Sequence, residues 1–409
     1  MGREILDLAT GRYADAVVSV DSRGQPVAAM ERVSLDAGGR QRTSSLTTLF
    51  DGKALTIDDT NIWDNQGTGT GAMVNNKYNM AVTAGQYLVR AGKFYCPYFS
   101  GKSQLVEVTM DNFQSEVGLT KRVGYFSSNA VAPYDTTKDG FWLESSPSGI
   151  SFVAQNAGTV VINSPLASWD NYSSISTYDW SKFTVIEFDF LWLGGTSVRT
   201  IMHINGVFEL AHTFEFSGNF TGTFIKSPNQ TVRYEIRSTT GVGYLNAICS
   251  QVATEGSAGE SGKGIAVFNT SAITCNTVGT IYALKSLKKN PTYRDNQIQV
   301  LNFGCIPLAT ADAGIMLMIL NPTVSAPITY TNNSRFQEGT PTNQTVTAGT
   351  GRIIYAIPVG QFGASQNLTD NFLSSLGISL NNTPDEVVFC YTPATSNQSI
   401  HSTINLKEY

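Results

Sequence analysis

The feature that most constrains this sequence is a run of alternating side chains that leads into a hairpin turn. One face of residues 183–193 carries four large apolar side chains, namely Ile186, Phe188, Phe190 and Trp192. Such alternation predicts a strand with one face in a core. Further on, the pair Asn205-Gly206 separates two alternating runs, residues 198–204 and 207–214. Because both residues of an Asn-Gly pair accept positive φ, this pattern predicts a β-hairpin with a type I′ turn.

The rest of the chain repeats the same signals. Charged residues make up only 14% of the 409 residues, against 41% hydrophobic and 11% aromatic, and the abundant Thr, aromatic, Asn and Gly residues favour strands and turns. The one helix candidate is residues 368–376, with Gly377 as its stop. We therefore expect an all-β protein with tandem β-sandwich, jelly-roll-like domains and an extended N-terminal arm.

Composition shifts suggest where the domains divide. The first part ends in the low-complexity tract 67–72, which is typical of a flexible linker. We expect a docking arm or small subdomain with its linker at 1–74, a β-sandwich at 75–300 and a second β-rich domain at 301–409. Residues 250–264, which contain four glycines, are expected to form a flexible surface loop.

The charge of the chain and its lack of long apolar stretches argue against nucleic acid and membrane as partners. The net charge of −5 and pI near 5.3 disfavour nucleic acid, and the one basic run, residues 285–289, is expected to be a solvated loop. No apolar stretch is long enough for a signal peptide or a membrane span, so we expect neither secretion by that route nor a membrane partner.

The five cysteines have no Cys-x-x-Cys spacing and are expected to be reduced core residues: Cys96, Cys249, Cys275, Cys305 and Cys390.

Catalytic and metal motifs are not recognisable, and we expect no enzyme, no cofactor and no metal. The sequence has three histidines, His203, His212 and His401. A regular hairpin would place His203 opposite Phe208 and His212 opposite Arg199, on one face but about 13 Å apart, too far to share a metal. The glycine-rich segment 256–264 has the wrong spacing for a phosphate-binding loop.

Three groups of residues are candidates for catalysis, cation binding or sugar binding, although each also has an ordinary structural explanation. Glu187 and Asp189 share a strand face and would permit acid/base work on a sugar, although carboxylates two apart are common on exposed strands. Asp58, Asp59 and Asp64 could hold a cation but lack the positions of a calcium loop. The aromatic residues of 169–172 and 178–180 could stack on sugars, but such residues more often close the end of a sandwich core.

Seven segments carry a family resemblance: residues 84–90, 95–104, 121–127, 139–144, 169–170, 190–194 and 228–236. In this order they resemble a family of virion structural proteins of tailed phages, including crAss-like phages of Bacteroidota, over residues 75–360. Related sequences are capsid, head-fibre or tail components. The resemblance implies a particle protein without known catalysis, and residues 1–74 match it least.

The resulting hypothesis is a virion structural protein, of the head-fibre or capsid-decoration type, assembled in the cytoplasm of the host bacterium. Its N-terminal arm would dock on a capsid or tail protein while the sandwiches project outward. A low-charge, strand-rich chain has surface to hide in a symmetric interface, so we expect a homo-oligomer, with a trimer as the best guess. The alternative is a receptor-binding tail or fibre protein that recognises host surface glycan; a depolymerase is a third possibility.

Overall fold

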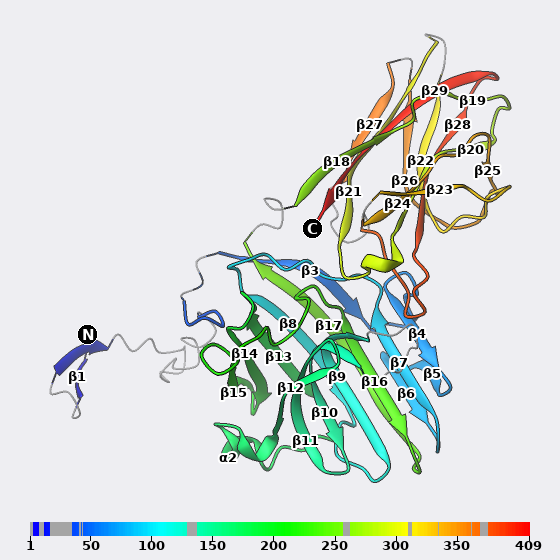
Figure 1. The fold of residues 1–409 in the computed structure, drawn as a ribbon. Helices are drawn as coiled ribbons and strands as arrows, with labels where there is room; N and C mark the ends of the chain where they lie inside the picture. The colour runs from blue at the N-terminus through cyan, green and yellow to red at the C-terminus, as the bar shows by residue number, and fades with distance from the viewer. Residues whose placement is uncertain are drawn as a thin grey trace.

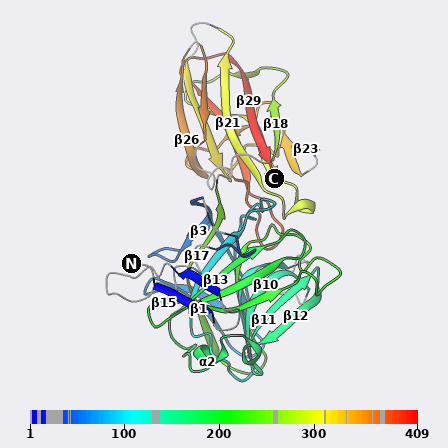
Figure 2. The same ribbon diagram turned by 90° about the vertical axis from the view of Figure 1, so that its left-hand side faces the viewer.

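The computed structural model describes residues 3–7, 12–16, 35–40, 42, 44–128, 137–256, 262–309, 313–333, 335–360, 362–368 and 375–409. Two β-sandwiches lie end to end, and both views show the second stacked on one end of the first (Figures 1 and 2). Every pair of strands in the described residues is antiparallel, as the pairing of β10 with β9 and β11 illustrates. The prediction of an all-β protein with tandem β-sandwiches is confirmed.

The first sandwich consists of two sheets. The seven-stranded sheet has the spatial order β12 (Thr159–Pro165), β11 (Gly149–Asn156), β10 (Lys138–Ser146), β9 (Leu119–Ser128), β16 (Val232–Ser238), β7 (Tyr87–Gly92) and β4 (Trp63–Gly67). The eight-stranded sheet has the order β15 (Val207–Glu215), β14 (Ser197–Ile204), β13 (Thr184–Leu191), β8 (Gln104–Asp111), β17 (Gly243–Glu255), β6 (Lys77–Val82) and β5 (Thr70–Val74), with β3 (Leu46–Lys53) also paired to β17.

The second sandwich is built in the same way from a five-stranded and a seven-stranded sheet. The five-stranded sheet has the order β18 (Lys263–Phe268), β29 (Gln398–Glu408), β21 (Ile298–Pro307) and β27 (Ala364–Asn367), with β19 (Ile273–Cys275) also on β29. The seven-stranded sheet has the order β23 (Tyr330–Asn333), β24 (Phe336–Gly339), β20 (Ile281–Lys289), β28 (Glu386–Pro393), β22 (Gly314–Leu320) and β26 (Arg352–Val359), with β25 (Thr345–Val346) on β20.

Short elements complete the described chain. A separate two-stranded sheet joins β1 (Arg3–Asp7) to β2 (Arg12–Ala16), and the helical turns are η1 (Leu166–Ser168), α2 (Tyr172–Ile175) and η2 (Pro291–Tyr293). Among the described residues, no helix has the length and apolarity needed to cross a membrane.

Of the expected helix 368–376, residues 369–374 lie outside the described part, Leu368 follows β27 directly, and Ser375 forms a bridge with Gln299.

Each sandwich has its own aromatic core between its sheets. In the first, Phe188 and Phe190 of β13 pack on Phe141 of β10 at ring-centroid distances of 5.5 and 5.1 Å. In the second, Phe303 and Phe389 are 5.4 Å apart. The alternating run at 183–193 thus becomes a core strand, as predicted, because one of its faces carries these phenylalanines.

The predicted domain boundaries need correction. Strands β3, β4 and β5 lie within residues 1–74, yet they pair inside the first sandwich. Strands β18, β19 and β20 precede residue 300, yet they pair inside the second. The sheets therefore divide the described chain between β17 and β18. Composition misplaces this boundary, because a strand can complete a sheet whose other strands lie far away in sequence.

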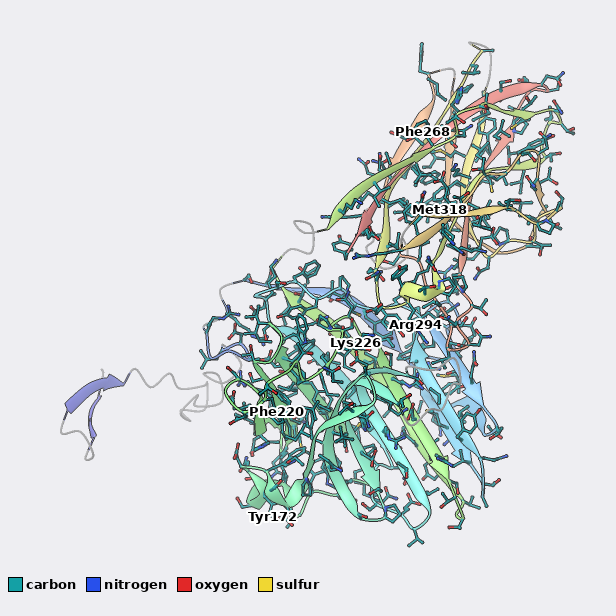
Figure 3. All side chains as sticks on the ribbon, viewed as in Figure 1. Tyr172, Phe220, Lys226, Phe268, Arg294 and Met318 are labelled. Carbon is teal, nitrogen blue, oxygen red and sulfur yellow. The ribbon has the colours of Figure 1, made fainter. Side chains whose placement is uncertain are left out.

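The two sandwiches are joined by a packed junction. Buried Lys93 of the first sandwich donates to buried Asp385 of the second at 2.7 Å. Leu380 packs against Val89 and Ala91, and its backbone N–H donates to Asp64 at 2.6 Å. Figure 3 places Arg294 in this region. Backbone, ionic and apolar contacts together hold the sandwiches against one another.

Candidate functional site

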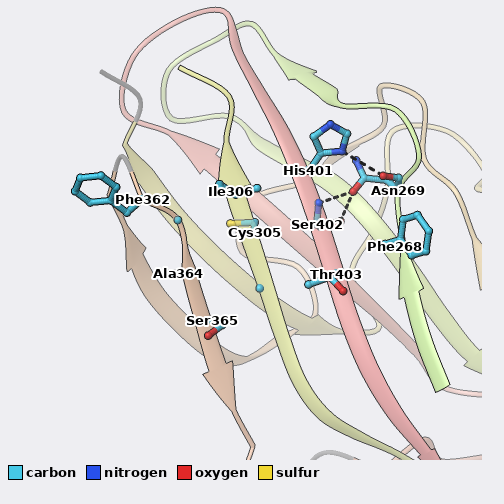
Figure 4. A pocket seen from close by; sticks show the side chains of 12 residues that line it. Phe268, Asn269, Cys305, Ile306, Phe362, Ala364, Ser365, His401, Ser402 and Thr403 are labelled. Carbon is cyan, nitrogen blue, oxygen red and sulfur yellow. Dashed lines mark hydrogen bonds between the residues drawn. The ribbon is translucent and has the colours of Figure 1, made fainter. Parts of the chain in front are cut away.

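A hollow of about 680 Å³ lies on the outer face of the five-stranded sheet in the second sandwich. It crosses the four neighbouring strands β18, β29, β21 and β27 (Figure 4). The residues that line it are Phe268, Asn269, Gly304, Cys305, Ile306, Phe362, Gly363, Ala364, Ser365, His401, Ser402 and Thr403. We call this hollow the trough. Its volume falls within the range of small-molecule sites.

Alternation along the strands creates the trough. On β29, Ile400, Ile404 and Leu406 are buried in the core, so His401 and Thr403 point to the opposite, outer face. Across the sheet, Thr403 pairs with Phe268 on one side and with Gly304 on the other, and Gly304 pairs with Ser365. The centre of this row carries no side chain at Gly304, which keeps the floor low.

Apolar side chains form the walls. Phe362 is 86% exposed, Phe268 59% and Ile306 50%, and Figure 4 shows the two phenylalanines at opposite edges of the sheet. Three strand spacings separate β18 from β27, so the two walls are about 14 Å apart. Exposing large apolar side chains beside a hollow is unfavourable in water, which makes the trough a candidate for ligand binding.

The presentation of Phe362 depends on a tight turn. The Gly363 N–H donates to the Gly360 carbonyl at 2.9 Å, and Gly363 has φ of +78°. A Cβ on Gly363 would lie 2.7 Å from the Cys305 carbonyl oxygen, so glycine alone fits there. This turn leads into β27 and leaves the Phe362 ring in solvent.

At the other end, Asn269 holds the position of His401. The Asn269 side chain accepts from the Ser402 N–H and hydroxyl, and donates to the carbonyls of Ser271 at 2.7 Å and Ile400 at 3.2 Å. The His401 Nδ1 lies 3.2 Å from the Asn269 carbonyl oxygen. A donating Nδ1 leaves Nε2 as an acceptor.

The described lining of the trough is uncharged. None of the described residues that line it is Asp, Glu, Lys or Arg. Glycoside hydrolysis uses two carboxyl groups on either side of the bond that is cleaved, and this lining supplies neither. The side chains offer instead two aromatic faces with hydroxyl, amide and imidazole groups between them.

The two carboxyl groups of β13 that could act together on a sugar are not both available, because one of them is held in ion pairs. Glu187 and Asp189 share the outer face of the eight-stranded sheet, but Asp189 is buried and forms ion pairs with Arg42 at 2.8 Å and Arg199 at 3.4 Å. Glu187 lies opposite Glu107 of β8 instead. Burial, and then the charges of Glu107 and Asp189, raise the pKa of Glu187 to about 7.

The histidines of the hairpin are not on one face. The turn is as predicted, with φ of +50° at Asn205 and +88° at Gly206, and His203 pairs with Phe208. However, a bulge shifts the register, so His212 pairs with Thr200 and not with Arg199. A one-residue shift moves a side chain to the other face, and His212 stacks near buried Trp169.

The other candidates have structural contacts. Asp58 binds Arg90 at 2.8 Å, and Asp64 accepts from Gln66 and Leu380. In the described part of the chain, no three His, Cys, Asp or Glu residues are grouped to hold a metal ion. Among the loop aromatics, Trp169 and Trp180 are buried in the core of the first sandwich, whereas Tyr172 is 40% exposed.

Two expectations about surface and core are corrected. The basic run 285–289 is not a loop: it belongs to β20, and Lys285 and Lys289 are buried. Four of the five cysteines are buried as expected, but Cys249 is exposed. Burial raises the pKa of both Cys275 and Cys305 to about 12.

The trough itself was not predicted. The alternation of 398–408 is the signal that could have revealed its central strand, because Ile400, Ile404 and Leu406 recur at even positions while the odd positions are polar. Which strands lie beside β29 depends on pairings between segments far apart in sequence, and no local pattern shows these.

No family model and no curated protein matches this sequence. Among solved structures, the chain is similar to the exoplasmic/lumenal domain of VIP36 in its Ca²⁺/Man3GlcNAc-bound form, with 9% identity and a TM-score of 0.35 over 51% of this chain and 89% of that one. It is similar to arcelin-5 of Phaseolus vulgaris (10%, 0.35, over 52% and 99%) and to a Bacillus licheniformis β-glucanase (14%, 0.33, over 52% and 99%).

Proposed function

We propose that this chain is a non-catalytic recognition protein of a tailed-phage particle and that the trough binds a neutral saccharide of the host surface. The trough carries the proposal. A sugar ring has an apolar face that packs on an aromatic ring and hydroxyl groups that exchange hydrogen bonds with amides and hydroxyls. The exposed rings of Phe362 and Phe268, with Thr403, Ser365 and His401 between them, match both needs.

The absence of charge from the described lining selects among ligands. Nucleic acid and acidic glycans are bound mainly through Lys and Arg, and neither occurs among the described residues that line the trough. A neutral saccharide requires no such charge. The particle location rests on the sequence resemblance, and the capsid or tail partner, the homotrimer and the docking role of the N-terminal segment belong to the same proposal.

Binding of purified full-length protein to an array of neutral and acidic glycans tests this function. We expect selective binding of neutral glycans, which Phe362→Ala and Phe268→Ala each weaken about tenfold, the equivalent of about 1.4 kcal/mol. Phe183→Ala is the matched control, because Phe183 is 56% exposed and lies in the first sandwich; its binding should equal that of the wild type.

Two results would contradict the proposal. The first is that the wild-type protein binds no neutral glycan on the array. The second is that Phe362→Ala leaves glycan binding intact but lowers the molar mass measured by light scattering, because the trough would then be an interface between copies of the chain.

A further inference from the structure

A row of asparagine side chains lies beside the trough on the same outer face. Asn302 of β21 pairs with Asn405 of β29 and with Asn367 of β27. Each is two residues from a residue of the trough floor on its own strand: Asn302 from Gly304, Asn405 from Thr403 and Asn367 from Ser365. Residues two apart on a strand share a face, so these amides continue the floor. We call them the amide row.

The amide row has hydrogen-bonding capacity to spare. The Asn405 Nδ2 donates to the Asn302 Oδ1 at 2.7 Å, which fixes both side chains. In the described part of the structure, the Asn302 Nδ2 and the Asn405 Oδ1 form no hydrogen bond with protein, and Asn367 is exposed. An amide presents a donor and an acceptor side by side, which suits the neighbouring hydroxyls of a sugar.

Space above the row is open on the side of β18. The residues of β18 that point outward beyond Phe268 are Ala266 and Gly264, and both are small and exposed. Ala266 pairs with Asn405. A ligand that leaves the trough over Thr403 therefore meets no bulky side chain from β18 before it reaches Asn405.

The spacing of the rows defines a length. Residues two apart on a strand are separated by about 7 Å, so His401, Thr403 and Asn405 span about 13 Å along β29. One sugar ring cannot reach from the His401 end of the trough to the amide row over this distance. An oligosaccharide that runs along the strands can.

From these observations we propose that the amide row is a second subsite, which extends the trough and makes the site selective for neutral oligosaccharides over single sugars. This inference rests on the proposed function, because it assumes that the trough binds saccharide. It assigns a role to Asn302, Asn367 and Asn405 that is separate from that of the two phenylalanines.

The test is a length series with full-length protein. Neutral gluco-, manno- and galacto-oligosaccharides, each from the monosaccharide to the hexasaccharide, are titrated against wild type, Asn367→Ala, Asn405→Ala and Phe362→Ala. Asn343→Ala is the control, because Asn343 is exposed in the same sandwich but away from the five-stranded sheet. Thermal unfolding of each variant checks that its fold is intact.

We expect the wild-type affinity to rise with length in at least one series. Asn367→Ala and Asn405→Ala should weaken only the longer ligands, by about fivefold, while Phe362→Ala should weaken every length. If Asn367→Ala and Asn405→Ala bind all lengths as the wild type does, or lose short and long ligands equally, the subsite is wrong while the trough remains a saccharide site. If the wild type binds no length, both proposals fail.

Discussion

Glu187 shows how burial changes the chemistry of a single carboxyl group. Its neighbours on the outer face of the eight-stranded sheet are Glu107 across the strand pair and Asp189 two residues on. Because burial and both negative charges disfavour its ionised form, its pKa rises from 4.5 to about 7. The folded state therefore binds more protons at Glu187 than the unfolded state does between these two pH values.

The stability of the protein therefore depends on pH through Glu187. Where the folded state binds the extra proton, the free energy of unfolding falls as pH rises, here from 4.5 to 7. Glu187→Gln removes this loss. We expect the variant to match the wild type near pH 4 and to be more stable at pH 8 by about 1–2 kcal/mol, measured by urea unfolding at both pH values. Exposed Glu215→Gln is the control, and an equal gain at both pH values would exclude a charge effect.

At the scale of elements, local patterns predicted strands well and pairings poorly. The Asn205-Gly206 turn and the core strand at 184–191 depend on neighbours in sequence, and both were predicted correctly. The bulge opposite Thr200 leaves Ala211 out of the register and in the core, and no local alternation reveals such a bulge. Likewise, the sequence predicts Lys285 and Lys289 to be surface residues, yet the partners of β20 bury them.

The N-terminal segment shows the same limit and yields a prediction. Composition alone assigns residues 46–74 to a docking arm, but they contain β3, β4 and β5. The first sandwich also holds residues before β3: Arg199 donates to the Leu35 carbonyl at 2.8 Å and Ser197 to the Ala37 carbonyl at 2.6 Å. A docking segment that can be removed without unfolding must therefore end near residue 34.

We expect deletion of residues 1–34 to leave both sandwiches folded and to abolish attachment to the particle. Deletion of residues 1–74 should instead unfold the first sandwich, because it removes β3, β4 and β5 from its sheets. Thermal unfolding followed by circular dichroism checks the folds, and cosedimentation with particles of a phage that lacks the gene checks attachment. Undiminished attachment after deletion of residues 1–34 would refute the docking role.

At the scale of the whole molecule, the junction between the two sandwiches contains a buried lysine. Lys289 at the end of β20 is fully buried, and its Nζ has no hydrogen-bond partner in the described structure. It lies 4.8 Å from the ring centroid of Tyr95 in the other sandwich. Burial, partly offset by Asp295, lowers the pKa of Lys289 from 10.5 to about 7.

This lysine should make the free energy of unfolding depend on pH. Between pH 7 and 10.5 the folded state binds fewer protons at Lys289 than the unfolded state does, so the free energy of unfolding rises with pH across that window. Replacing a buried charge with an apolar side chain of similar volume stabilises a protein by up to about 4 kcal/mol. Lys289→Met should therefore raise the free energy of unfolding by about 1–4 kcal/mol at pH 6.

The gain should shrink at pH 9, where the folded wild-type protein already holds a neutral amine at the junction. Denaturant unfolding at the two pH values measures this, with Lys182→Met as the control because its side chain is 76% exposed. A gain that is the same at pH 6 and pH 9 would mean that the methionine acts through packing alone. A gain that falls with pH would show that the buried positive charge of Lys289 destabilises the contact between the sandwiches. The backbone, ionic and apolar contacts of the junction would then stabilise the folded protein by more than this charge destabilises it at neutral pH.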